Sequence, residues 1–402
     1  MNSAAQFTPQ QRHRATLLLF FVLLLIMMGF SVLFPIKAYY LEQFGADAFI
    51  MGLISTVYSL MQFIFAPLWG RLSDRVGRRP VLMVGLLGFV VSQTLFGLAK
   101  AIWMLFAARI LGGMLSAAAM PTAMAYIADI TPPEERAKGM GLLGAAFGLG
   151  VIVGPGVGGV LGTISLGLPF FVSAGLAFVA FLGVLAFLPE SLPPEVRQAA
   201  HKEEARSRWE AFSPDMAALY LVTLALSLGM VGIEVTFSFF AADRLQLAVN
   251  ETSWIFVVMG IVASIVQGFL VGPVQKAIGE SRMMLGGLVI GALGMAGVIL
   301  TTNPVLVTVA ICVLSVGTGL ARPANSALIS RHARVGQGIA IGLMDSFDSL
   351  GRIIGPTAAG FIYRVSPALP YLSGALLFLV AFGLGLFWSV SARTSVTSSA
   401  SQ

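Results

Sequence analysis

The chain alternates between long apolar runs and short polar loops. Twelve runs of about 20 mostly apolar residues are each long enough to cross a hydrocarbon core of about 30 Å. They cover residues 15–38, 49–69, 81–99, 103–127, 138–162, 168–188, 215–240, 252–272, 283–301, 304–329, 337–362 and 368–391. A backbone in lipid must satisfy its own hydrogen bonds, and no two-residue alternation typical of a barrel is visible. The pattern therefore predicts an all-α membrane protein with 12 transmembrane helices in two pseudo-symmetric six-helix bundles.

The composition agrees with a chain that is dissolved in lipid. Of its 402 residues, 57% are hydrophobic and only 10% are charged, and the mean hydropathy is +0.90. A water-soluble domain of this composition would expose large apolar patches. The single cysteine, Cys312, excludes a disulfide framework, and its apolar surroundings predict a small buried side chain. The first apolar run has no small-residue cleavage site, so we expect it to be retained as a span.

Basic residues predict the orientation of the spans. Lys and Arg near the cytoplasmic ends of membrane helices outnumber those on the other side. Here 17 basic residues fall on the side that carries both termini and four on the other, which are Lys37, Lys100, Arg244 and Arg364. We expect a multi-pass protein whose termini are both cytoplasmic. The net charge of +6 then reflects membrane topology, and we expect no nucleic acid as a partner.

One long polar segment divides the chain. A proline-rich stretch of mixed charge separates the sixth and seventh apolar runs. The predicted organisation is an N-terminal cytoplasmic segment 1–14, a six-helix bundle 15–189, a cytoplasmic linker 190–214, a second bundle 215–391 and a cytoplasmic tail 392–402. The stretches that begin at Gly141 and Gly342 align at an offset of 201 with five Gly or Pro matches, which indicates a duplicated fold.

The loop after the second run has a recognisable motif, "GRLSDRVGRRP". It resembles the signature between the second and third helices of the major facilitator superfamily, and the matching residues are Gly70, Asp74, Arg75, Gly77, Arg78 and Arg79. The resemblance implies that Asp74 faces the N-terminal end of the eleventh helix, near Gly336 to Gly338, where the helix dipole attracts a carboxylate. Such a contact would form in one transport state and break in the other. The alternative is that these charges only fix topology. A degenerate copy, "GPVQKAIGESR", starts at Gly272.

Two further motifs resemble those of proton-coupled drug exporters within this superfamily, the branch of multidrug and tetracycline efflux. The fifth run matches the antiporter motif at Gly141, Gly150, Gly154, Pro155, Gly158 and Gly159, whose glycines are expected to allow close contact with the opposite half. Ordinary helix packing is the alternative. The fourth run contains Arg109, which the resemblance implicates in proton transfer. A guanidinium in hydrocarbon is costly, so Arg109 should face a cavity or a partner. The first run keeps Gly29 and Pro35 of a drug-transporter pattern but has Ala38 in place of a second proline.

Three carboxylates lie within apolar runs and are candidates to carry protons: Glu234, Asp345 and Asp348. Asp345, Asp348 and Arg352 share one helix face because they stand at i, i+3 and i+7. In one interpretation Asp348 and Arg352 simply neutralise each other. In the other, Arg352 or Arg322 exchanges partners with the aspartates as protons bind and leave. Glu234 is the first choice for the coupling acid, with Arg109 as a partner from the other half.

The predicted roles of the remaining polar residues are less specific. Asp129 ends the fourth run and is predicted to act at a gate or a helix end. Six polar side chains are candidates either to line a substrate cavity or to form interhelical hydrogen bonds: Tyr58, Gln62, Gln93, Tyr126, Gln267 and Asn325.

The combined prediction is a proton-coupled exporter in the inner membrane of a bacterium. It would move lipophilic small molecules, cations among them, by alternating access, and so confer antibiotic resistance. Uptake or facilitated diffusion of a small metabolite or organic anion, and export of a lipid or siderophore, remain alternatives. No catalytic cluster, metal-ligand spacing or phosphate loop is visible, so we expect no enzyme activity, cofactor or metal. The expected partners are the bilayer, a small-molecule substrate and protons, and the expected oligomeric state is a monomer.

Overall fold

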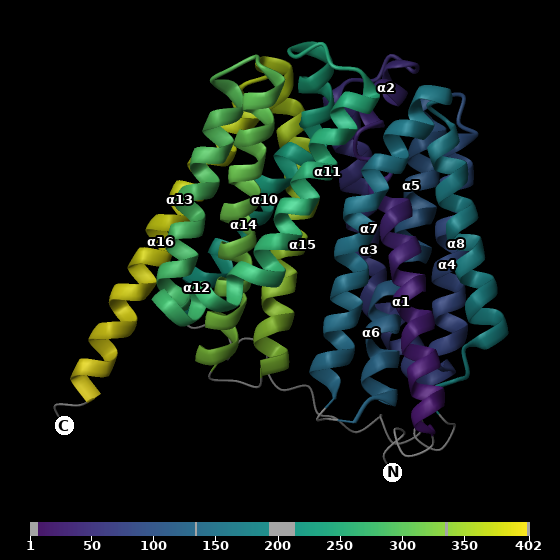
Figure 1. Ribbon diagram of the computed structural model, residues 1–402, viewed down its shortest axis with the longest axis horizontal. Helices are drawn as coiled ribbons and strands as arrows, with labels where there is room; N and C mark the ends of the chain where they lie inside the picture. The colour runs from purple at the N-terminus through teal and green to yellow at the C-terminus, as the bar shows by residue number, and fades with distance from the viewer. Residues whose placement is uncertain (1–6, 133–134, 193–213, 334–336, 400–402) are drawn as a thin grey trace. The chain divides into compact units, whose positions relative to one another are not determined.

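The computed structural model describes residues 7–132, 135–192, 214–333 and 337–399, and every regular element in these ranges is a helix. The all-α prediction is therefore confirmed for this part of the chain. Figure 1 shows the elements in chain order. Before the central linker they are α1 (Pro9–Ser31), α2 (Lys37–Glu42), α3 (Ala48–Val76), α4 (Arg78–Gly97), α5 (Ile102–Ser116), α6 (Ala119–Ile130), α7 (Arg136–Ile164) and α8 (Leu168–Phe187).

The elements after the linker follow the same plan. They are α10 (Pro214–Asp243), α11 (Val249–Ile265), the π-helical segment η4 (Val266–Leu270), α12 (Val271–Ile278), α13 (Glu280–Ile299), α14 (Pro304–His332), α15 (Gln337–Val365) and α16 (Leu369–Ser399). Most of the predicted linker, residues 193–213, lies outside the described residues.

The described helices match the twelve predicted spans with three local differences. Eleven are long and apolar enough to cross a membrane. The twelfth, α15, has 29 residues but is less apolar because it carries Asp345, Asp348 and Arg352. The predicted fourth span is interrupted at Ala117 and divides into α5 and α6. The predicted eighth span contains the five-residue π segment η4, a local widening that is frequent at functional sites.

Helix starts follow local sequence signals. Thr8 caps α1 through a capping box with Gln11, and Asn303 caps α14 by accepting from the backbone N–H of Val305 at 2.9 Å. Gly77 precedes α4 with φ of 116°, a backbone conformation that favours glycine. The two polar caps satisfy N–H groups in the first turn of their helices, and Gly77 supplies the backbone conformation of the turn before α4.

The described residues fall into two compact units. The first comprises Met1–Ala46, Val57–Glu204 and Ala248–Val257, and the second comprises Asp47–Thr56, Ala205–Leu247 and Val258–Gln402. These units differ from the predicted halves in two short segments. Asp47 and the first nine residues of α3 belong to the second unit, and the start of α11 belongs to the first unit.

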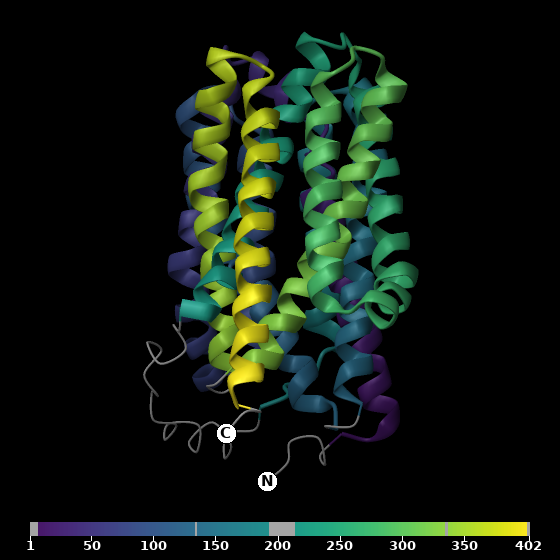
Figure 2. The same ribbon diagram turned by 90° about the vertical axis from the view of Figure 1, so that its left-hand side faces the viewer.

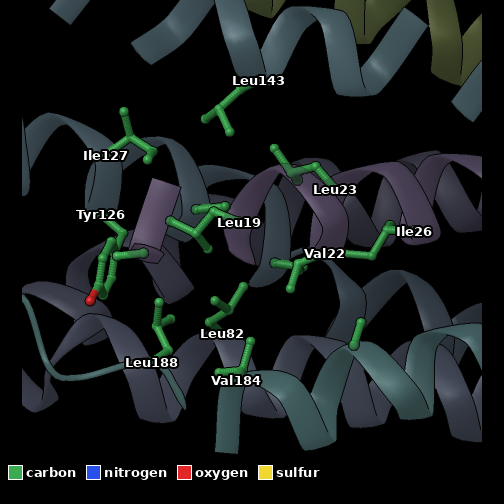
Figure 3. Close-up of a cluster of buried hydrophobic side chains, with 14 of the residues drawn as sticks. Leu19, Val22, Leu23, Ile26, Leu82, Tyr126, Ile127, Leu143, Val184 and Leu188 are labelled. Atoms are coloured by element: carbon green, nitrogen blue, oxygen red, sulfur yellow. The ribbon is translucent and has the colours of Figure 1, made fainter. Parts of the chain in front are cut away.

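The first unit has an apolar core built by five helices. The core contains Leu19 and Leu23 of α1, Leu82 of α4, Ile127 of α6, Leu143 of α7 and Val184 of α8, all of which are fully buried (Figure 3). Side chains in lipid gain little from leaving one apolar medium for another, so close packing is what favours this contact.

The second unit is organised around α10, α13 and α16. Helix α10 packs against α15 and α16, and α13 packs against α14 and α16. Figure 2 shows α16, in yellow, extending along the full height of this unit. Helices α13 and α14 approach so closely that a Cβ atom on Gly317 would lie 2.3 Å from the backbone nitrogen of Gly291. Glycine at this position therefore permits the tight crossing of the two helices.

Candidate functional site

Asp348 on α15 lies between two arginines of the second unit. Its Oδ2 accepts from Arg352 Nε at 2.9 Å, and its Oδ1 accepts from Arg322 Nη2 at 3.4 Å. Arg352 is one turn further along α15, whereas Arg322 comes from α14. The Asp348 side chain is 26% exposed, and those of Arg322 and Arg352 are 41% and 43% exposed. One carboxylate therefore bridges two guanidinium groups that still have donors free to bind another group.

Glu234 on α10 belongs to the same network. It interacts electrostatically with both Arg322 and Arg352. Its helix is held against α15 where Ser227 Oγ donates to the backbone oxygen of Asp348 at 3.0 Å. Glu234 thus has cationic neighbours within its own unit. The predicted partnership with Arg109 involves a residue of the first unit and stays a prediction.

Asp345 differs from the other two carboxylates. It is exposed and has a repulsive electrostatic interaction with Asp348, one turn further along α15. Within the described residues it forms neither an ion pair nor a hydrogen bond. Asp348 pairs with Arg352, as the interpretation of simple neutralisation expects. It also contacts Arg322, which the interpretation of partner exchange requires.

These charges lie well inside their helices. At about 1.5 Å per residue, Glu234 is about 14 Å from the end of α10 and Arg352 is about 20 Å from the end of α15. Arg322 is about 15 Å from the end of α14. A guanidinium that faced lipid at such a depth would be costly, so the exposed parts of both arginines are expected to meet water or a polar ligand.

The first unit buries a single arginine in the middle of a span. Arg109 on α5 is 7% exposed, and its guanidinium carbon lies 4.5 Å from the ring centre of Phe96 and 5.3 Å from that of Tyr58. Among the described residues no carboxylate pairs with it. Aromatic faces attract a cation electrostatically, and they stabilise this charge in the absence of an acid.

Polar groups beside Arg109 form a short chain of hydrogen bonds. Gln62 Nε2 donates to Tyr58 Oη at 3.1 Å, and Tyr58 Oη shares a hydrogen bond of 3.1 Å with Ser116 Oγ. Tyr58 thus combines a ring contact to the arginine with a hydroxyl that is already bonded. Of the six predicted cavity or bonding residues, only Tyr58 and Gln62 are brought together.

The other four predicted polar residues are separated. Gln93, Tyr126 and Asn325 are nearly fully buried and bond to backbone oxygens of Gly29, Pro189 and Leu219, respectively. The hydrogen bonds of Gln93 and Asn325 are interhelical, whereas that of Tyr126 joins α6 to the segment after α8. Gln267 is exposed within the π segment η4.

The signature loop centres on Arg78, which is nearly buried. Its Nη1 lies 2.6 Å from Asp74 Oδ1 and donates to Ser73 Oγ at 2.6 Å, while its Nε donates to Asp129 Oδ2 at 3.0 Å. We call Arg78 and these three partners the Arg78 hub. Asp129 lies one residue before the end of α6 and joins this helix to the start of α4, while its predicted role at a gate or a helix end stays a prediction. Of the residues expected to receive Asp74, Gly336 lies outside the described part of the chain, and α15 begins directly after it at Gln337, so this contact stays a prediction.

Two details of this loop were not apparent in the sequence. Gly70 lies inside α3 and not in the turn, because the helix continues to Val76. The turn itself depends on Gly77. Glu190, which follows α8, accepts from the backbone N–H groups of Arg78 at 2.8 Å and Arg79 at 3.2 Å. A carboxylate at this position satisfies the free donors of α4 and complements its helix dipole. Arg75 is exposed in the last turn of α3.

The second unit repeats the hub with opposite charges. Positions 202 residues after Gly77, Arg78 and Asp129 are Gly279, Glu280 and Arg331. Gly279 has φ of 81°, and Glu280 accepts from Arg331 Nη1 at 3.0 Å. Gln275 Nε2 also donates to Glu280, at 2.8 Å. The degenerate copy of the motif, which begins at Gly272, therefore contributes the acid of an ion pair. Here the acid, Glu280, is nearly buried, and the base, Arg331, is exposed.

The antiporter motif packs mainly within its own unit. A Cβ atom on Gly154 would lie 1.9 Å from Ser31 Oγ of α1, Gly150 also meets α1, and Gly158 meets Val32 directly after it. Only Gly159 of the predicted set meets a helix from after the linker, at Ser253 of α11, and Gly141 has no neighbour within 4 Å. Ser253 itself belongs to the first unit, so the expected contact of these glycines with the opposite half stays a prediction. Close packing of α7 on α1 explains the other glycines, and Pro155 stands inside the helix.

One ion pair joins α15 to the residues just before α3. Arg364 Nε donates to Asp47 Oδ2, and the same guanidinium lies 4.4 Å from the ring centre of Phe49. Burial raises the pKa of Asp47, but the hydrogen bonds from Arg364 and from the backbone N–H of Ile50 outweigh it and lower the pKa below its usual value.

Comparison with known families identifies the architecture. The profile of the Major Facilitator Superfamily matches residues 19–248 and again residues 219–402. The chain belongs to the Major Facilitator Superfamily. It is therefore a transporter and not an enzyme, and the resemblance drawn from the motifs is confirmed. The two matches also agree with a two-domain fold of this superfamily.

Relatives within the superfamily are named for drug resistance. The transporter is 29% identical over 366 residues to Multidrug resistance protein 2 of Bacillus subtilis (strain 168), covering 90% of this chain and 92% of that protein. It is 34% identical over 337 residues to the class C Tetracycline resistance protein of Escherichia coli, covering 82% of this chain and 85% of that protein. Its fold resembles a bacterial homolog of the human lysosomal transporter Spinster, with a TM-score of 0.80, 14% identity and coverage of 95% and 98%.

Proposed function

We propose that this transporter exports lipophilic small molecules in exchange for protons, from the inner membrane of a bacterium. The observation that carries the proposal is the network of Glu234, Asp348, Arg322 and Arg352 in the middle of otherwise apolar helices. Charges at this depth are costly and are kept where they bind ions, protons or substrates. The resistance functions that name the relatives support the direction and the class of substrate.

The carboxylates of this network, together with Asp345, are the proposed proton carriers. A carboxylate in a span binds a proton more readily than one in water because burial penalises its charged form. The arginines Arg322 and Arg352 would exchange partners as the acids gain and lose protons, and Arg109 would contribute from the first unit. Their partly exposed side chains support this role, because a group that must change partners cannot be enclosed on every side.

The Arg78 hub is the proposed conformational gate. It joins α3, α4 and α6 through charges that are partly shielded from solvent, so separating them is costly. The placement of 17 basic residues against four supports a cytoplasmic position for this hub and for both termini. We propose that the protein works as a monomer with its two six-helix halves alternating between states.

Proton exchange is tested in proteoliposomes that contain the purified protein. With the interior more acidic than the bath, adding ethidium or tetracycline outside should cause substrate-dependent proton release. Glu234→Gln should reduce this release, whereas Glu251→Gln, a matched change in the exposed first turn of α11, should not. Transport of every substrate at an unchanged rate after collapse of the pH gradient would contradict the proposal.

A further inference from the structure

The span formed by α5 and α6 is broken in the middle. Helix α5 ends at Ser116, and α6 begins at Ala119. Pro121, in the first turn of α6, has no backbone N–H to donate to the Ala117 carbonyl, and its ring would clash with that carbonyl in a continuous helix. Carbonyl groups at the break therefore need partners from elsewhere, because lipid supplies none.

The Trp69 indole supplies one of these partners. The Ala118 N–H donates to the Leu115 carbonyl at 3.2 Å, whereas its acceptor in a regular helix would be the Met114 carbonyl. The Met114 carbonyl instead accepts from Trp69 Nε1 of α3 at 2.6 Å. A backbone carbonyl left unpaired within a span is costly, so this side-chain donor stabilises the broken form.

Proline alone does not divide a span in this protein. Pro67 stands inside α3 and Pro155 stands inside α7, and both helices continue past the proline. The break near Pro121 differs from these two sites because an indole from a neighbouring helix satisfies the carbonyl that the break sets free. The proline and the tryptophan together therefore account for the interruption.

The two pieces of the span carry different parts of the proposed machinery. Helix α5 carries Arg109, whose guanidinium lies against Tyr58, and α6 carries Asp129, which pairs with Arg78. At about 1.5 Å per residue, Asp129 lies about 18 Å beyond Ala117. A change of about 10° in the direction of α6 would move Asp129 by about 3 Å, which is as long as its contact with Arg78. The angle at the break therefore decides whether the Arg78 hub can form.

Helix α3 contacts the span on the α5 side of the break. Tyr58 Oη shares a hydrogen bond with Ser116 Oγ at the end of α5, and a Cβ atom on Gly113 would lie 2.6 Å from the Tyr58 carbonyl. Trp69 follows about three turns later on α3, and Asp74 of the hub follows Trp69 on the same helix. One helix thus carries the contact to Arg109, the donor to the break and a member of the hub.

We propose that Trp69 is a positioning residue of the transport cycle. Its indole N–H replaces the hydrogen bond that the Met114 carbonyl loses at the break, and so fixes the direction of α6 relative to α5. This inference rests on the proposed function, because it links the proposed contribution of Arg109 to the proposed gate at the Arg78 hub. Without the indole N–H, the direction of α6 is less fixed and the hub forms less often.

The test removes the donor and the proline separately and together. Trp69→Phe keeps an aromatic ring but lacks the N–H, so it should lower the maximal rate of ethidium transport into acidic proteoliposomes about two- to tenfold, as expected for one lost hydrogen bond. Trp103→Phe, a matched change at an exposed tryptophan of α5, should leave this rate unchanged. Pro121→Ala returns a backbone N–H to the span, so in that background Trp69→Phe should change the rate less than about twofold.

Hydrogen exchange of the indole groups tests the contact without any transport. In protein with isotopically labelled tryptophan, the NMR signal of the Trp69 indole N–H, assigned through Trp69→Phe, should exchange with solvent much more slowly than that of Trp103. Pro121→Ala should speed its exchange. Equal effects of Trp69→Phe on transport with and without Pro121 would show that the ring only packs, and would overturn the assignment. Exchange of the Trp69 and Trp103 signals at the same rate would also overturn it. Absence of proton-linked transport by the wild type would instead contradict the proposed function, and the exchange rates would still decide the role of Trp69 at the break.

Discussion

Glu280 Oε2 lies 3.0 Å from Arg331 Nη1 and repeats, with the charges exchanged, a contact found 202 residues earlier in the chain. The earlier contact joins Arg78 Nε to Asp129 Oδ2, also at 3.0 Å. In both units the less exposed member follows a glycine with positive φ and begins a helix. The duplicated fold has therefore kept the geometry of the contact and changed its polarity.

Exchanging the charges of Glu280 and Arg331 together should restore stability that a single charge reversal removes. Glu280→Arg alone places a second positive charge beside Arg331 and should cost about 1–3 kcal/mol of stability. The double variant with Arg331→Glu recreates the polarity of the first unit and should regain part of the loss. The unfolding temperature in detergent measures both effects. Equal stability of the single and double variants would show that the pair is not coupled.

Glu190 should stabilise the start of α4. Its carboxylate accepts from the backbone N–H groups of Arg78 and Arg79, so Glu190→Ala leaves these donors without their cap and should cost about 1–2 kcal/mol. The measurement is thermal unfolding of the purified protein. Glu135→Gln is the control, because Glu135 precedes α7 but makes no side-chain cap. If both variants shifted the unfolding temperature equally, Glu190 would not stabilise α4 as a cap.

Gly154 should tolerate no side chain. A methyl group there would meet Ser31 Oγ at 1.9 Å and the Met28 carbonyl at 2.7 Å, so Gly154→Ala must displace α1 from α7. Overpacking of this kind typically costs about 1–3 kcal/mol. Gly144→Ala on the same helix is the matched control, since nothing lies within 4 Å of its added atom. Thermal unfolding should separate the two variants, and identical values would show that α7 does not depend on this approach.

The ion pair of Asp47 and Arg364 should make stability depend on pH in the acid range. The folded pKa of Asp47 is lowered, so its contribution is present above the ordinary value near 4 and disappears as the pH falls through the lowered pKa. The difference in unfolding temperature between the wild type and Asp47→Asn should be constant above about pH 5 and vanish near pH 2–3. If the difference in unfolding temperature grew toward low pH, the lowered pKa of Asp47 would be contradicted.

Regular spacing made parts of the site predictable from the sequence. The pair of Asp348 and Arg352 follows from the rule that residues four apart share a helix face. The contact of Arg322 with Asp348 does not follow from any spacing rule, because it depends on how α14 packs against α15. The same is true of Glu190, which is 112 residues from Arg78 in the sequence. Long-range packing leaves no periodic signal in one chain.

The fold was easier to predict than its irregularities. Apolar runs of membrane length gave all twelve helical spans, since the bilayer imposes the same length on each. The division of the fourth span at Ala117 and the π segment around Gln267 have no comparable signal. The glycines of α7 were predicted to meet the other half, yet their spacing suits any closely packed neighbour. Here that neighbour is α1 for Gly150, Gly154 and Gly158.

A proton gradient that drives export also sets the steady-state ratio of substrate across the membrane. In everted vesicles with a set pH difference and no membrane potential, the logarithm of the ethidium ratio should be proportional to that difference. For exchange of one proton per cation, the ratio should rise about tenfold for each pH unit. A ratio that stays at one over the whole range of imposed pH differences, while ethidium still equilibrates through the protein, would contradict the account.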